Sequence, residues 1–167
     1  TLFRSSAQAA ATVQFLNVTS SANVNYWSIG NEPWLQANQN ETPDPTEAQI
    51  ATRIATYFKS RSAAMKLVDP SIKIFGVDSE DLQSGLHARL FGGSDNIAGK
   101  VTGKNYYYCD GLSWHRYPQE NGIDPALQGL ADIRSRIAQS AKIASREAMH
   151  TLERGAIEFL HFGGGLA

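Results

Sequence analysis

Strand-like and helix-like patterns alternate along this chain of 167 residues. Short runs rich in β-branched and aromatic residues are each followed by a longer segment in which apolar residues recur every three or four positions. This alternation predicts parallel βαβ units, because two parallel strands need a long crossover between them and a helix supplies it. We therefore expect an α/β fold with one parallel sheet. The expected strands are 24–29, 72–77, 109–114 and 156–160, and the expected helices are 5–16, 44–68, 86–91 and 124–155.

The second of these helices has the clearest end signals. In the sequence Asp44-Pro45-Thr46-Glu47, an aspartate suits the N-cap, the proline suits the first turn, and the glutamate stands at the capping-box position. The helix is expected to stop at Asp69-Pro70, because a residue that precedes proline disfavours helical backbone.

Polar residues follow the expected strands. Asn31-Glu32 follows the first strand, Asp78 the second and His115-Arg116-Tyr117 the third, and Glu158 lies in the fourth. Because parallel strands point the same way, their carboxyl ends meet at one edge of the sheet, which is where ligands bind in such folds. We therefore expect these side chains to converge on one rim.

The segment after the first strand has the chemistry of a sugar site. Gly30 turns the chain and presents Asn31-Glu32-Pro33, with Trp27 before it and Trp34 after it. Indole rings stack on sugar faces, an amide hydrogen-bonds a hydroxyl, and a carboxylic acid can give its proton to a leaving oxygen. Trp34 is the better stacking platform, because Trp27 lies inside the strand. The alternative interpretation is a structural glutamate at a Gly-Asn turn.

The run Trp27-Ser28-Ile29-Gly30-Asn31-Glu32-Pro33 resembles the fourth-strand motif of clan A glycoside hydrolases, which are (β/α)8 barrels. This resemblance implies that Glu32 is the catalytic acid/base and that Asn31 contacts the sugar 2-hydroxyl. It also implies that the parallel βα units belong to a TIM (β/α)8 barrel that is incomplete in this chain.

Residues 110–118 resemble the sixth-strand end of several families of the same clan. That resemblance implies that His115 and Tyr117 line the sugar subsite and help to hold the nucleophile. One complete βα unit separates the two motifs, which fits the order of strands in a barrel. Asp78 is expected to hydrogen-bond sugar hydroxyls. The alternatives are a His115 bonded to a backbone carbonyl and an Asp78 that is only solvated.

A retaining glycosidase needs a second carboxylate, roughly 5 Å from the first. In clan A it is a Glu at the end of the seventh strand, and Glu158 is the only acid that follows the helix 124–155. Ile157 stands where the family has a small or hydroxylated residue. Two interpretations stay open: Glu158 is the nucleophile, or it is an acid without a catalytic role and the nucleophile lies outside the chain.

The resemblance runs from the third helix of a barrel to its seventh strand, so we expect residues 1–167 to form a single partial catalytic domain. A complete barrel takes about 250 residues. We therefore expect the chain to be a fragment with little or no activity by itself. The open edges of its sheet are expected to make it marginally stable or prone to self-association.

The composition of the chain argues against several classes of binding partner. A net charge of −1, with acids and bases mixed, argues against a nucleic-acid partner, and no apolar run is long enough to cross a membrane. No cofactor is implied, and the histidines lack a spacing suited to a metal. Cys109 is the single cysteine, which excludes an internal disulfide and favours a buried, inert thiol. Asn17-Val18-Thr19 and Asn40-Glu41-Thr42 fit the N-glycosylation pattern and favour a secreted, extracellular protein.

The predicted function is hydrolysis of O-glycosidic bonds in a polysaccharide or glycoside by a retaining, two-carboxylate mechanism, with a carbohydrate as the substrate. A first alternative is a non-catalytic, carbohydrate-binding piece of a barrel. A second is another parallel α/β enzyme, such as a doubly wound one, although no Gly-rich phosphate turn or Gly-x-Ser-x-Gly elbow is present. A third is a chain that does not fold alone. The loops 36–44 and 81–104 are expected to set sugar specificity.

Overall fold

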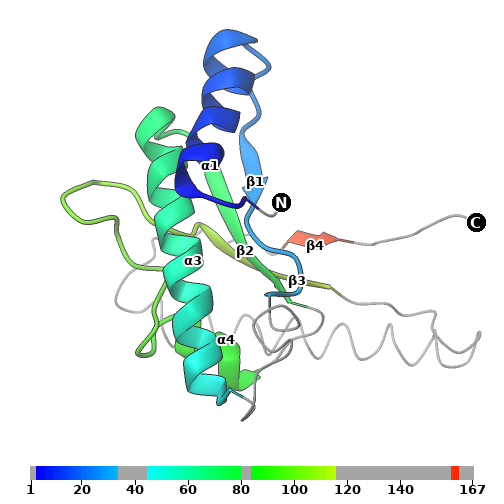
Figure 1. The fold of residues 1–167 in the computed structure, drawn as a ribbon, viewed down its shortest axis with the longest axis vertical. Coiled ribbons are helices and arrows are strands. Elements are labelled where there is room, and N and C mark those ends of the chain that lie inside the picture. The colour runs from blue at the N-terminus through cyan, green and yellow to red at the C-terminus, as the bar shows by residue number, and fades with distance from the viewer. Residues whose placement is uncertain (1–2, 34–44, 80–83, 116–158, 162–167) are drawn as a thin grey trace, which may run out of the picture.

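The fold is given by a computed structural model, which describes residues 3–33, 45–79, 84–115 and 159–161. Helices and parallel strands alternate, and the predicted α/β fold is confirmed (Figure 1). The elements are α1 (Ser6–Val13), the π-helix η1 (Gln14–Thr19), β1 (Tyr26–Ser28), α3 (Glu47–Val68), β2 (Lys73–Ser79), α4 (Ser84–Leu90), β3 (Gly111–His115) and β4 (Phe159–His161).

The strands form one sheet in the order β1-β2-β3-β4, and every neighbouring pair is parallel. The order in space is therefore the order in the chain, and each described connection moves to the next position in the same direction. Among the described strands, β1 and β4 lie at the edges of the sheet. Self-association through these edges stays a prediction.

The described helices cover one face of the sheet, and α1 and α3 lie side by side on it (Figure 1). Alternate strand residues point to this face and join a continuous apolar core with the helices. From the strands, the core takes Trp27, Ile74, Leu112 and Trp114. The positions between them, among them Ser28, Phe75, Ser113 and His115, belong to the opposite face, which is much more polar.

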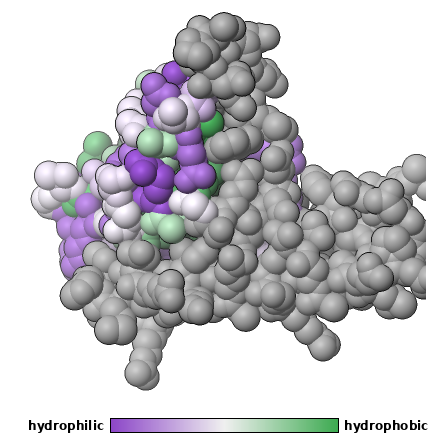
Figure 2. All heavy atoms as spheres, turned by 90° about the horizontal axis from the view of Figure 1, so that it is seen from below, coloured by the Kyte–Doolittle hydropathy of each residue, from purple (hydrophilic) through white to green (hydrophobic). Residues whose placement is uncertain are grey.

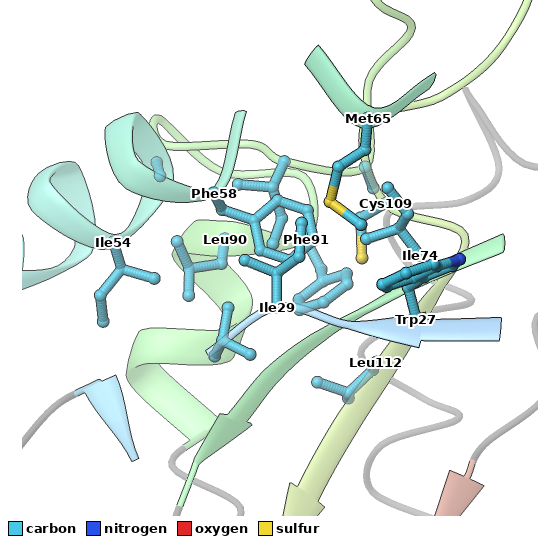
Figure 3. Close-up of a cluster of buried hydrophobic side chains, with 14 of the residues drawn as sticks. Trp27, Ile29, Ile54, Phe58, Met65, Ile74, Leu90, Phe91, Cys109 and Leu112 are labelled. Atoms are coloured by element: carbon cyan, nitrogen blue, oxygen red, sulfur yellow. The ribbon is translucent and has the colours of Figure 1, made fainter. Parts of the chain in front are cut away.

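The core lies between α3, α4 and the sheet (Figure 3). Phe58 and Met65 of α3 point toward the sheet, and Leu90 and Phe91 approach from the side of α4. Gly76 of β2 lies directly under the Phe58 ring, and no Cβ would fit there. Cys109 is buried as predicted, and burial raises the pKa of its thiol to about 12, so that the thiol stays protonated at neutral pH.

The helix α3 begins two residues later than the sequence suggested. Its N-cap is Thr46, whose hydroxyl accepts a hydrogen bond from the Gln49 backbone N–H at 3.3 Å. The Gln49 side chain in turn accepts from the Thr46 backbone N–H at 2.8 Å, which completes a capping box. The prediction of an Asp44 cap with Glu47 at the capping-box position was wrong, because Thr46 and Gln49 form the box and leave Glu47 as the first helical residue.

Asn17 has a structural role that its glycosylation pattern did not indicate. Its side-chain amide donates to the Val24 carbonyl at 3.0 Å and to the Asp69 carboxylate at 2.8 Å, and its carbonyl accepts from the Val24 N–H at 2.8 Å. These bonds join the end of the first helical segment to the entry of β1 and to the end of α3. Asn40, the other candidate acceptor, lies outside the described residues.

The strand and helix ranges predicted for the described segments agree with the structure to within a few residues. The sequence predicted that Asp78 follows the second strand. The strand β2 extends to Ser79, so Asp78 lies within it. The strand predicted at 156–160 is described as β4, which begins at Phe159. The helix predicted at 124–155 lies outside the described residues.

Seen from below, the described residues present a mainly hydrophilic surface with small hydrophobic areas (Figure 2). None of the described helices is both long enough and apolar enough to cross a membrane.

Candidate active site

The turn after β1 is shaped by Gly30. The Ile29 N–H donates to the Phe75 carbonyl at 3.0 Å, which keeps the backbone against β2 just beyond the end of the strand. Gly30 then has a φ of +117°, and a Cβ on it would lie 2.6 Å from the Val77 carbonyl oxygen. Only glycine fits this position, because it tolerates both the backbone conformation and the close approach. The turn directs the chain across the carboxyl end of β2.

Glu32 and Asp78 meet at this point through their backbones. The Glu32 N–H donates to the Asp78 carbonyl at 2.7 Å. Both residues have left-handed backbones, with φ of 48° for Glu32 and 50° for Asp78. Aspartate tolerates this region moderately well and glutamate less so, and such a conformation costs roughly 1–3 kcal/mol per residue. The surrounding hydrogen bonds therefore hold the two residues in a strained arrangement.

The side chain of Glu32 reaches His115 at the end of β3. The distance between Glu32 Oε1 and His115 Nδ1 is 3.2 Å, and the two side chains are 24% and 11% exposed. The residues are 83 positions apart in the chain, so the parallel sheet brings them together. The carboxyl group is thus partly open to solvent and held on one side by an imidazole.

The carboxylate of Asp78 is also held. The Ser28 hydroxyl of β1 donates a hydrogen bond to Asp78 Oδ2. The Asp78 N–H donates a hydrogen bond to Ser113 Oγ of β3 at 3.3 Å. Asp78 therefore links all three strand ends, and part of its hydrogen-bonding capacity is used within the protein. Its predicted role in binding sugar hydroxyls stays a prediction.

Ser28 and Ser113 were not among the residues singled out from the sequence. Both occupy alternate strand positions that share a face with His115, while Trp27, Leu112 and Trp114 turn to the helices. That alternation was the signal that could have identified them. Together with Asp78 and Glu32 they make the rim of the sheet polar where β1, β2 and β3 end.

The structure brings together three of the predicted site residues: Glu32, Asp78 and His115. Asn31 is exposed in the turn that carries Glu32. Trp34, Tyr117 and Glu158 lie outside the described residues, so their roles stay predictions. Within the described ranges, no group of three or more His, Cys, Asp or Glu side chains is arranged to hold a metal ion.

Comparisons with known proteins give a likeness in fold. No protein-family model matches the chain, and a search of curated proteins found no match. Among solved structures, a glucosidase from Croceicoccus marinus is similar, with a TM-score of 0.50 and 18% sequence identity over 87% of this chain. The chain spans only 28% of the glucosidase chain. At this identity the likeness concerns the fold alone.

Proposed function

We propose that this chain is part of a retaining glycoside hydrolase in which Glu32 is the catalytic acid/base. The observation that carries the proposal is the hydrogen bond between Glu32 Oε1 and His115 Nδ1 at the carboxyl edge of a parallel sheet. A partly exposed carboxyl group at that edge, fixed by a second titratable side chain, has the chemistry that acid/base catalysis needs.

The hydrogen bond is compatible with both protonation states that the mechanism requires. A proton on His115 Nδ1 can make this bond by donating to Glu32 Oε1 in both states. When Glu32 is protonated, its own proton is then on Oε2, where it can be given to a glycosidic oxygen. When Glu32 is ionised, a proton on Nδ1 of His115 can orient the carboxylate toward water. His115 would act as a positioning residue throughout the cycle.

The reaction would proceed in two displacements. In the first, a carboxylate attacks the anomeric carbon, the glycosidic C–O bond breaks, and Glu32 gives its proton to the leaving oxygen. In the second, Glu32 takes a proton from water, whose oxygen attacks the anomeric carbon and releases the enzyme carboxylate. Glu158 is our candidate for the attacking carboxylate, with a glutamate outside this chain as the alternative.

The remaining residues would bind the sugar. Asn31, next to the acid, would contact the 2-hydroxyl, and Asp78 would accept from a further hydroxyl while Ser28 orients it. Trp34 and Tyr117 would supply aromatic surface for the sugar ring. These assignments rest on the sequence motifs and on the shared rim of Glu32, Asp78 and His115.

We further propose that the sheet belongs to a TIM barrel that is incomplete in this chain. Two observations support this: the four strands are parallel and in sequential order, and the fold resembles a segment of a glucosidase. In a doubly wound sheet, the strand order reverses at the switch point where the ligand binds. The parent enzyme would supply the other strands, and a secreted location fits such an enzyme.

The experiment uses the parent enzyme and a pair of variants, Glu32→Gln and the control Glu47→Gln. Glu47 is an exposed acid in the first turn of α3. Glu32→Gln should lower kcat/KM on alkyl glycosides by about 10²–10⁴-fold. It should lower the rate of the first displacement far less on 2,4-dinitrophenyl glycosides, because that leaving group departs without a proton. Glu47→Gln should leave both rates unchanged.

Three outcomes are distinguishable. Equal loss on both leaving groups would refute an acid role for Glu32. Full activity of Glu32→Gln would refute any catalytic role. If the parent binds oligosaccharides, cleaves none of the substrates, and Glu32→Gln binds equally well, then the protein is a carbohydrate-binding barrel without turnover.

A further inference from the structure

A buried polar pair lies behind the candidate site. Ser79 at the end of β2 and His87 of α4 are both fully buried, and 3.0 Å separates Ser79 Oγ from His87 Nε2. The surroundings are otherwise mostly apolar: Leu86 and Leu90 are also fully buried, and the His87 ring stacks with Phe91 at a centroid distance of 6.4 Å. A buried polar pair in such surroundings is retained only if its hydrogen bonds are satisfied.

The pair anchors an irregular end of β2. The register between β2 and β3 shifts between Val77 and Ser79, and Asp78 lies in the shift with a left-handed backbone. Ser79 is the next residue, where the strand pairs again with Trp114. Fixing Ser79 from the helix side therefore fixes the far end of the bulge that contains Asp78.

The bulge is in turn connected to the proposed acid. The Asp78 carbonyl accepts from the Glu32 N–H at 2.7 Å, and the Asp78 carboxylate accepts from Ser28. A continuous series of contacts thus runs from His87 through Ser79 and Asp78 to Glu32. Each step is a covalent neighbour or a hydrogen bond, so a shift at Ser79 moves the carbonyl that holds the Glu32 turn.

We propose that His87 is a positioning residue for the active site: through Ser79 it locks the bulge at Asp78 and so sets the position of Glu32. The inference rests on the proposed function for its catalytic meaning, but the structural link can be tested without substrate. The pair is not itself a Ser-His nucleophile, because both side chains are fully buried and neither can reach a substrate.

The first test measures hydrogen exchange of the Glu32 backbone amide in the parent enzyme without substrate. Four variants are compared: Ser79→Ala and His87→Leu remove the bond, His87→Gln keeps a side-chain nitrogen near the position of Nε2, and Leu86→Ala removes a buried apolar side chain of α4 but leaves both partners of the bond in place. Loss of one hydrogen bond at this place should speed exchange of the Glu32 amide by about fivefold. Leu86→Ala and His87→Gln should stay near the wild-type rate once corrected for global stability.

The proposal fails if Ser79→Ala leaves the Glu32 amide unchanged, or if Leu86→Ala speeds it equally. Should His87→Leu not fold, Ser79→Ala and His87→Gln still decide the question. The double variant Ser79→Ala/His87→Leu should exchange no faster than Ser79→Ala alone, since both substitutions remove the same bond.

The second test measures kinetics in the parent enzyme. Ser79→Ala and His87→Leu should each reduce kcat by about tenfold to a hundredfold while KM stays within about twofold, because the acid is displaced. His87→Gln, which keeps the bond, should retain most of the wild-type kcat. A change in KM alone, or no recovery by His87→Gln, would assign His87 a structural role only. Altered exchange of the Glu32 amide together with an unaffected Glu32→Gln enzyme would uphold the link and refute the catalytic assignment.

Discussion

The buried pair Lys66–Asp110 offers a prediction whose sign is not obvious. Lys66 lies near the end of α3 with a side chain that is 1% exposed, and it contacts Asp110, which is 13% exposed and precedes β3. The Lys66 Nζ also donates to the Tyr107 carbonyl at 2.7 Å. The Asp110 carboxylate has two further partners, the Ile74 N–H at 2.9 Å and Lys73 Nζ at 3.4 Å. The two charges are therefore unequally supported.

Removing Asp110 should lower the free energy of unfolding more than removing Lys66. Asp110→Ala leaves the Lys66 ammonium buried with one neutral acceptor, and an uncompensated buried charge costs about 3–5 kcal/mol. Lys66→Met leaves the Asp110 carboxylate with two partners, the Ile74 N–H and the exposed Lys73. This substitution should therefore lower the free energy of unfolding by about 1–3 kcal/mol. In the double variant no buried charge remains. Adding Lys66→Met to Asp110→Ala should consequently restore about 1–2 kcal/mol of the free energy of unfolding.

Urea unfolding at neutral pH, followed by circular dichroism and extrapolated linearly, gives the required free energies. Lys104→Met, at an exposed lysine, is the control and should change stability by less than about 0.5 kcal/mol. If Lys66→Met further destabilised the Asp110→Ala protein, then the buried ammonium would not be the source of the cost and the reasoning would be refuted.

The same pair predicts a dependence on pH. Burial lowers the pKa of Lys66 from its ordinary value of 10.5, although the hydrogen bond and charge of Asp110 act in the opposite direction. The unfolded chain then binds this proton more tightly than the folded chain. Stability associated with Lys66 should therefore rise as the pH increases from the lowered pKa toward 10.5, and the advantage of wild type over Lys66→Met should grow over that interval.

Two further predictions concern other sites. Gly30→Ala should destabilise the fold by roughly 3–5 kcal/mol, because it forces a side chain into a backbone of φ +117° and against the Val77 carbonyl; urea unfolding measures the loss, and an unchanged midpoint would contradict the described turn. Asp95 is buried, and burial raises its pKa, but hydrogen bonds from Thr52, Ser94 and Arg89 outweigh burial and lower that pKa overall. The stability that Asp95 contributes should be present above the ordinary value of 3.8 and should be lost as the pH falls through its lowered pKa, so the gap between wild type and Asp95→Asn, measured by unfolding at successive pH values, should narrow in acid.

Local patterns were enough to predict the α/β fold and the shared rim. The strand at Trp27 and the helix that contains Phe58 have strong hydrophobic periodicity, and the rule for parallel strands then places Glu32, Asp78 and His115 at one edge. The start of α3 was harder, because two capping signals overlap and only the box between Thr46 and Gln49 forms.

The sequence did not predict the bulge at Asp78 or the contacts of Ser79 and Ser28, because these features depend on how the strands pair. The bulge at Asp78 shifts the register of β2 by one residue, and a one-residue shift changes which side chains face the helices. Ser79 consequently meets His87 on the helix side. Ser28 reaches Asp78 from 50 positions away in the chain, a contact that depends on strand pairing alone.

The interactions at the two ends of the sheet differ in kind. At the amino end, Lys66 and Asp110 tie α3 to β2 and β3 through a buried charge pair, which concerns stability. At the carboxyl end, Glu32 and Asp78 hold left-handed backbones in contact with each other, an arrangement that costs stability. Strain in non-glycine residues persists only where surrounding contacts impose it, and it is commonest at functional sites. Four of the described non-glycine residues have left-handed backbones: Ser21 and Asn23 precede β1, and Glu32 and Asp78 lie at the carboxyl rim. The second pair supports the proposed site because its strain is combined with the contact between Glu32 and His115.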